Sequence, residues 1–136
     1  MKHEKSCGCI IVKGDTVLVE KQKHKDERFW NFPKGHQDPG ETDLETALRE
    51  TKEEVGLDVE ITDNRPITMT YIIDKGTTEK IVHLFLARLV DQNAKITLQE
   101  EEVEEARWVP FAEVESLLTF ERSKIAWQEA LSRLAK

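Results

Sequence analysis

One helix in this chain is marked at both ends, and it limits the folds that the sequence can adopt. Thr42 is a good N-cap, and Glu45, three residues later, completes a capping box. Gly56 supplies the expected C-terminal stop. Between them, four residues recur at helical spacing on one stripe: Leu44, Leu48, Thr51 and Val55. The sequence therefore predicts an amphipathic helix over 42–56 whose stripe packs on a core.

The segments around this helix are mostly short strands. Alternation and turn residues predict strands at about 7–12, 16–21, 29–32, 57–62, 67–74, 80–89 and 106–109, and helices at about 110–118 and 121–135. Ile125 is one of the apolar positions of the last helix. The charged stretch "QKHKDER" and the glycine-bearing segment 34–41 are predicted as loops. This order indicates a mixed β-sheet flanked by helices, an α/β or α+β fold in a single domain, residues 1–136.

Length and charge exclude several partners. The 136 residues are 38% hydrophobic and 35% charged with a net charge of −7, which is typical of a water-soluble globular domain. No apolar run approaches the roughly 18–20 residues that span a bilayer, and the N-terminal stretch lacks the features of a signal peptide. The negative charge disfavours a nucleic-acid groove, which normally needs a basic surface. We therefore expect no membrane or DNA partner, while phosphate substrates carried by a divalent metal stay open.

The two cysteines, Cys7 and Cys9, do not form a recognisable metal motif. No second Cys or Cys/His pair completes a zinc site. Residues two apart on a strand point to the same face, so we interpret both as small residues on a half-buried strand. Reduced thiols fit a cytoplasmic protein.

The predicted helix carries three glutamates that repel one another. Glu50, Glu53 and Glu54 fall within roughly a 100° arc, on the side away from the apolar stripe. Like charges four residues apart and acids in the last turn each destabilise a helix slightly. The helix alone leaves two interpretations open, a solvated face or a metal site. The loop before it favours metal, because Gly35 and Gly40 permit backbone conformations that bring carbonyl and carboxylate oxygens together.

At this point the spacing resembles a known signature. Gly35, five residues, Glu41, seven residues and the run 49–57 match the pattern of the Nudix hydrolases, G-x5-E-x7-R-E-U-x-E-E-x-G-U, where U is a bulky apolar residue. Thr51 stands where an apolar residue is usual. The resemblance implies an α/β/α sandwich with a mixed sheet between helices, and an enzyme that hydrolyses phosphoric anhydride bonds.

The resemblance also implies roles for individual residues. Glu50, Glu53 and Glu54 would bind Mg²⁺ or Mn²⁺, two or more ions, and the carbonyl of Gly35 would be a further ligand. Arg49 would orient a glutamate, Glu53 by spacing, and Glu41 would support the loop. An accessory acid is expected from the stretch before Trp108. The pattern selects Glu102, with Glu101 and Glu105 as rivals and a solvated acidic loop as the alternative.

The flanking residues indicate a substrate. "FWNFPKGH" and "DLETALRET" resemble the asymmetrical diadenosine tetraphosphate hydrolases, in which Thr51 is itself shared, and this implies cleavage to ATP and AMP. Lys34 and His36 would contact phosphates, and Tyr71 and His83 lie on strands that would line the cleft. Each also fits a plain role in the loop or core. We expect a small-molecule substrate and a monomer or weak dimer.

Rival functions remain. Related enzymes remove pyrophosphate from RNA 5′ ends, hydrolyse oxidised nucleoside triphosphates or cleave diphosphoinositol polyphosphates. For the last, "KQKHKDER" would supply a basic rim. A non-catalytic nucleotide sensor is disfavoured, because the chain retains all three glutamates and the arginine of the signature.

Overall fold

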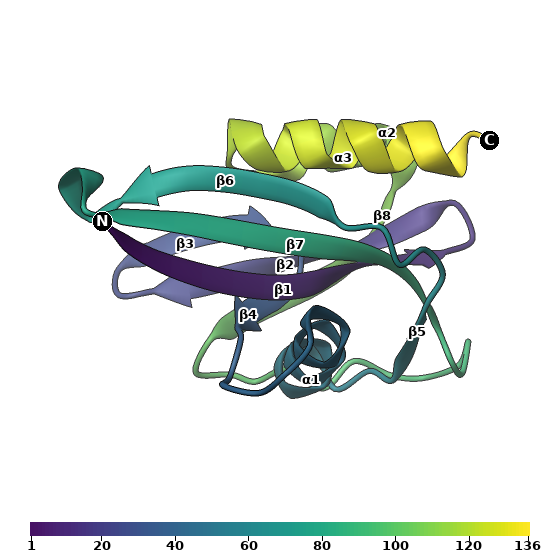
Figure 1. Ribbon diagram of the computed structural model, residues 1–136. Helices are drawn as coiled ribbons and strands as arrows, with labels where there is room; N and C mark the ends of the chain where they lie inside the picture. Colours follow the sequence, from purple (N-terminus) through teal and green to yellow (C-terminus); the bar gives the residue numbers. More distant parts are fainter.

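The protein folds as one mixed β-sheet with helices on both faces (Figure 1). The computed structural model describes all 136 residues. The strands are β1 (Lys2–Lys13), β2 (Thr16–His24), β3 (Glu27–Asn31), β4 (Lys34–His36), β5 (Val59–Ile61), β6 (Ile67–Ile73), β7 (Thr78–Leu89) and β8 (Val103–Pro110); the helices are α1 (Asp43–Val55), α2 (Phe111–Leu117) and α3 (Glu121–Leu134), with a short 3₁₀ turn, η1 (Asp74–Gly76). Helix α1 covers one face of the sheet, and α2 and α3 cover the other (Figure 1). The predicted sandwich of helices around a mixed sheet is confirmed.

The centre of the sheet splits, and this split creates room for a site. β1 runs parallel to β7 over eleven residue pairs but pairs with β2 only at Val12 and Lys13. Beyond that point β4 pairs with β1 and β3 pairs with β2. The connection through Phe32 and Pro33 therefore crosses the gap between the two diverging strands. Gly8 permits the crossing, because a Cβ there would overlap the carbonyl oxygen of Pro33.

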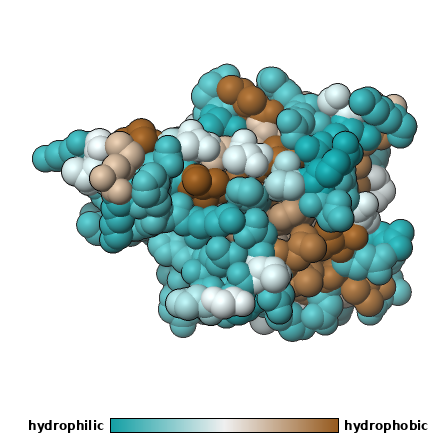
Figure 2. All heavy atoms as spheres, in the orientation of Figure 1, coloured by the Kyte–Doolittle hydropathy of each residue, from teal (hydrophilic) through white to brown (hydrophobic).

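Each face of the sheet has its own hydrophobic core. Trp127 of α3 is fully buried against Phe111 and Phe32, with ring centroids 5.3 and 6.3 Å away. The opposite core lies under α1 and contains Cys7 and Cys9, both fully buried, unpaired and on the same face as predicted. Hydrophilic residues dominate the outer surface in the view of Figure 2, with hydrophobic atoms in separate patches. No helix is long and apolar enough to cross a membrane.

Helix α1 begins and ends where the sequence predicts. The Thr42 hydroxyl accepts a hydrogen bond from the Glu45 N–H at 3.1 Å, and the Glu45 carboxylate accepts one from the Thr42 N–H at 2.9 Å. Gly56 adopts φ 70°, the left-handed conformation that ends the helix. The predicted stripe is only partly right, since Thr51 and Val55 are buried while Leu48 is 38% exposed. The helix instead buries a neighbouring face through Ala47, so the packing stripe is rotated away from Leu48.

Two other expectations about local structure are wrong. Residues 22–28 form no open loop, because β2 continues to His24 and pairs with β3 as a hairpin. β4 lies within the segment predicted as a loop and forms because β1 offers it a free edge. β4 depends on backbone pairing with the distant strand β1, and the hairpin on pairing with the adjacent strand β3. The periodicity of a charged or glycine-bearing segment indicates neither pairing. Ile125 is 58% exposed and does not contribute to the core.

Replacement of the N-cap tests how strongly local signals hold α1 in place. We expect Thr42→Ala to lower the free energy of unfolding by about 0.5–2 kcal/mol, because the Glu45 N–H loses its acceptor. Urea unfolding followed by circular dichroism measures this. Thr70→Ala, at an exposed position of β6, is the matched control. Equal stability of the two variants would mean that packing alone holds the helix.

Candidate active site

A cleft of about 830 Å³ opens where β1 and β2 diverge, between α1, the β2–β3 hairpin, β6 and the start of α3. Its lining contains five acidic residues, Glu20, Glu50, Glu53, Glu54 and Glu102. It also contains seven basic residues, Lys23, His24, Lys25, Lys34, His36, Lys80 and Arg122. The cleft is therefore strongly polar, and charges of both signs face the same space.

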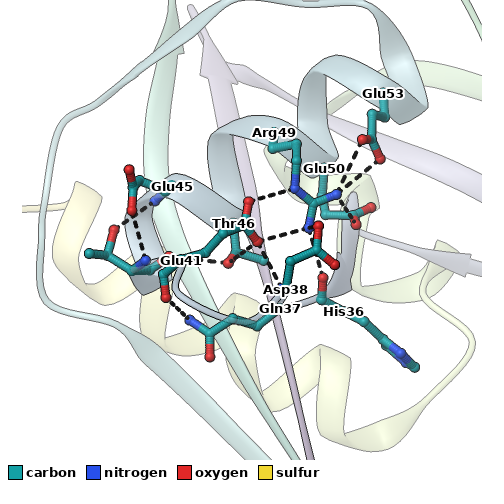
Figure 3. Close-up of polar contacts among 10 residues, drawn as sticks. His36, Gln37, Asp38, Glu41, Glu45, Thr46, Arg49, Glu50 and Glu53 are labelled. Carbon is teal, nitrogen blue, oxygen red and sulfur yellow. Dashed lines mark hydrogen bonds and ion pairs between the residues drawn. The ribbon is translucent and has the colours of Figure 1, made fainter.

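Arg49 holds the acidic residues of α1 and the preceding loop together (Figure 3). Its guanidinium donates to both carboxylate oxygens of Glu41, at 2.7 and 3.0 Å, and one nitrogen donates to Glu50 at 2.8 Å and to Glu53 at 3.1 Å. It also donates to the carbonyl of His36 at 2.9 Å. The expected contact with Glu53 is thus one of several. Hydrogen bonds from Arg49 lower the pKa of the Glu41 carboxyl to about 2.

Gly35 brings β4 directly against the Glu50 side chain. A Cβ at this position would lie inside van der Waals contact of the Glu50 carboxylate, so only glycine allows the approach. Glu50 is 9% exposed, and burial raises its pKa despite the hydrogen bond from Arg49. Of the two interpretations that the sequence left open for the acidic stripe, a solvated face therefore does not describe Glu50. The split of the sheet and β4 cover this flank of the helix.

Glu54 and Glu20 form a second, deeper acidic pair. Glu54 is 4% exposed, accepts a hydrogen bond from the Lys34 N–H at 3.3 Å, and comes from α1. Glu20 is fully buried and comes from β2. Burial raises the pKa of both carboxyls, and their mutual repulsion raises that of Glu54 further. Our sequence analysis missed Glu20, although strand alternation places it on the same inward face as buried Leu18.

A group of cationic side chains also lines the cleft and is called the cationic wall; it comes from β4, β7 and α3 and consists of Lys34, His36, Lys80 and Arg122. Burial, followed by the charge of Lys80, lowers the pKa of Lys34 to about 8. Lys80 approaches the His36 ring nitrogen at 3.4 Å. The guanidinium of Arg122 lies 3.7 Å from the centre of the Tyr71 ring, so Tyr71 also faces the cleft. Lys34, His36 and Tyr71 are therefore brought together, as the sequence leads us to expect.

His83 lies elsewhere. It points to the α1 side of β7, where its Nδ1 is 3.4 Å from a carboxylate oxygen of Asp43, and it does not line the cleft. The alternation of β7 explains this, because Val82 and Leu84 occupy the other face and pack in the core beneath α3. The expectation that His83 lines the cleft is therefore wrong, and His83 is not part of the site proposed below.

Among the acids before Trp108, only Glu102 reaches the cleft. It lies just before β8, beside Val103, which also lines the space. Glu101 is not part of the lining, and Glu105 forms an ion pair with Arg107 on the surface. The spacing rule therefore selected the one residue of the three that faces the other carboxylates.

The donor set suits a hard divalent cation, although no three acidic, His or Cys side chains converge as a ready-made metal site. Glu50 and Glu53 are instead directed toward Arg49. Carboxylate and carbonyl oxygens are the ligands that Mg²⁺ and Mn²⁺ prefer. One buried carboxylate oxygen of Glu20 has no hydrogen-bond partner. A bound cation would give this oxygen a partner.

Comparisons with known proteins identify the family of this chain. A family model described as the NUDIX domain matches residues 2–128. The chain belongs to the Nudix family. It is a Nudix hydrolase, and members of this family generally need divalent metals.

Several relatives of this Nudix hydrolase carry functional names. The asymmetrical bis(5′-nucleosyl)-tetraphosphatase of Rattus norvegicus is 35% identical over 137 residues, covering 92% of this chain and 91% of the relative. An RNA pyrophosphohydrolase of Legionella pneumophila is 30% identical, with 92% and 79% covered. Among solved structures, a C. elegans Ap4A hydrolase binary complex superposes with a TM-score of 0.84 at 25% identity, covering 97% of this chain and 98% of that one.

The unusual residue of the Nudix signature is accommodated in the core. Thr51 is fully buried on the core-facing side of α1, where the signature normally has an apolar side chain. The Thr51 hydroxyl has no hydrogen-bond partner. Its surroundings are apolar enough that burial raises the pKa of the neighbouring Cys9 thiol to about 11. Thr51 therefore packs as a small core residue and takes no part in the cleft.

The contact between Gly35 and Glu50 gives a stability test of the site. We expect Gly35→Ala to lower the free energy of unfolding by about 1–3 kcal/mol, because the added methyl group displaces the Glu50 carboxylate. In the Glu50→Ala background, Gly35→Ala should lower the free energy of unfolding much less than it does in the wild type. The truncated side chain at position 50 then leaves space for the added methyl group. Urea unfolding of all four proteins measures the coupling. Additive effects would show that the two residues are not in contact.

Proposed function

We propose that this Nudix hydrolase, a single domain over residues 1–136, cleaves diadenosine tetraphosphate asymmetrically to ATP and AMP with Mg²⁺ or Mn²⁺. The observation that carries the proposal is the division of the cleft into a carboxylate wall on α1 and a cationic wall on β4, β7 and α3. A polyphosphate chain needs cations on all sides. Side chains supply them only on the cationic wall, so bound metal ions would supply them on the carboxylate wall. The rat and C. elegans relatives are named for this substrate.

The carboxylate wall would hold the metal. Glu50, Glu53 and Glu54 are the proposed ligands, with the carbonyl of Gly35 and with Glu102 as the accessory ligand or base, for two or more ions. Bound divalent cations neutralise phosphate charge and lower the pKa of a water ligand, which prepares it to attack phosphorus. Arg49 would act indirectly, by keeping Glu50 and Glu53 at the cleft.

The cationic wall would bind the phosphates beyond the metal. Lys34 and His36 project from β4, and Lys80 and Arg122 stand beside them. Positive groups in a partly buried cleft bind phosphate oxygens more strongly than exposed ones, because less water competes. Tyr71 would contact an adenosine end, with the Arg122 guanidinium already against its ring.

Other parts of the proposal rest on the chain as a whole. The net charge of −7 supports a small-molecule substrate over DNA, and nothing in the fold favours a membrane partner. We propose a monomer or weak dimer. The unpaired thiols of Cys7 and Cys9 support a cytoplasmic location.

A second substrate class is favoured by the β2–β3 hairpin. It carries Lys23, His24 and Lys25 to the rim of the cleft, within the stretch "KQKHKDER" that the sequence offers as a basic rim. A basic rim of this kind suits a more anionic ligand than a dinucleotide, such as a diphosphoinositol polyphosphate. Because some relatives are named RNA pyrophosphohydrolases, triphosphorylated RNA ends are a third candidate substrate.

Product analysis tests the substrate. We expect diadenosine tetraphosphate, incubated with the protein and Mg²⁺, to give equal amounts of ATP and AMP on ion exchange, and EDTA to abolish the reaction. A diphosphoinositol polyphosphate and triphosphorylated RNA serve as parallel substrates. ADP as the only product would mean symmetrical cleavage and contradict the proposal. If the protein hydrolyses one of the parallel substrates but not the dinucleotide, the proposed Nudix chemistry stands and the proposed substrate is wrong.

Replacement of one proposed ligand tests the metal assignment. Glu53→Gln should reduce turnover at least about 10–100-fold, the loss typical even when a group that merely supports a metal ligand is removed. The fold should survive, because the Glu53 side chain is 47% exposed. Steady-state kinetics with the exposed control Glu60→Gln measure the effect. Turnover equal to that of the control would refute the role of Glu53.

A further inference from the structure

Glu20 occupies a position that the Nudix signature does not account for. It lies on β2, where it pairs with Asn31 of β3, and outside the segment 35–57 that carries the signature. Its side chain is fully buried, yet it lines the cleft beside Glu54 of α1. An acidic residue without solvent contact is rare unless a partner compensates its charge. The partner of Glu20 therefore decides what this residue does.

The protein supplies only part of that compensation. One carboxylate oxygen of Glu20 accepts a hydrogen bond from the Gln22 side chain at 2.9 Å. The same Gln22 nitrogen is shared with the carbonyl of Phe32, at 3.3 Å. The other oxygen of Glu20 is buried and has no partner. Buried polar groups are almost always satisfied, so this oxygen marks a place where something else binds.

No neighbouring side chain neutralises the pair formed by Glu20 and Glu54. Lys34 is near enough to influence both carboxyls but forms no ion pair with either. Arg49 is committed to Glu41, Glu50 and Glu53 on the other side of α1. A proton shared between the two carboxyls would satisfy one charge, whereas a divalent cation would satisfy both.

We propose that Glu20 is an additional ligand for a divalent cation, which it holds together with Glu54 between strand β2 and helix α1. The inference rests on the proposed function, because it requires the cleft to bind metal. It adds a ligand from the sheet to those of α1, so the cation would link β2 to α1 beside the point where β1 and β2 diverge. A proton shared by Glu20 and Glu54 is the competing explanation.

Metal titration of Glu20→Gln separates these explanations without any substrate. Glutamine keeps the shape and the contact with Gln22 but removes the charge. We expect the dissociation constant for Mn²⁺, measured by calorimetry or electron paramagnetic resonance, to rise about 10–100-fold or more. The increase in melting temperature caused by Mn²⁺ should shrink, while the metal-free variant should melt at the same temperature as wild type or higher. Glu60→Gln is the matched control.

The outcomes are distinguishable. Mn²⁺ binding to wild type and to Glu20→Gln with equal affinity would overturn the inference and favour the shared proton. Absence of Mn²⁺ binding by wild type would overturn the proposed function itself. If Glu20→Gln does not fold, Glu20→Asp replaces it, since aspartate keeps the charge on a shorter side chain. Weaker Mn²⁺ binding by folded Glu20→Asp would support the inference, and unchanged affinity would overturn it.

Discussion

The hydrogen bonds of Arg49 are the interaction on which the site depends. Without a cation at this point, Glu41, Glu50 and Glu53 would repel one another across a short distance. The planar guanidinium reaches all three carboxylates and also the His36 carbonyl, so it ties the loop after β4 to α1. A lysine has no such fork of donors and would satisfy only part of this set. The glutamates can therefore crowd one helix and still face the cleft.

The divergence of β1 and β2 is the second constraint. A continuous pairing of these strands would close the sheet and leave no space beside α1. Because β3 and β4 each take one of the freed edges, their connection crosses the gap and delivers Lys34, Gly35 and His36 to the cleft. The same arrangement buries Glu20 of β2 and Glu54 of α1 beside each other. Strand pairing, more than any single residue, therefore brings the acidic and cationic side chains to one cleft.

Most of the acidic and most of the basic residues of the cleft come from different structural elements. The acidic residues come mainly from α1, with Glu20 and Glu102 from β2 and the segment before β8. The basic residues come from the β2–β3 hairpin, β4, β7 and α3. A chain with a net charge of −7 thus gathers positive charge where a polyphosphate would bind. Net charge alone describes the solution behaviour of the chain and says little about its site.

The sequence by itself determined what depends on neighbours along the chain. The capping box, the Gly56 stop and the Nudix signature follow from spacing within 23 or so residues of one segment, because helix hydrogen bonds and caps are local. Only the tertiary structure decided the strand pairing of β4, the role of Glu20 and the displacement of His83 from the cleft. Alternation shows which residues share a face of a strand, but the packing of distant elements decides what covers that face.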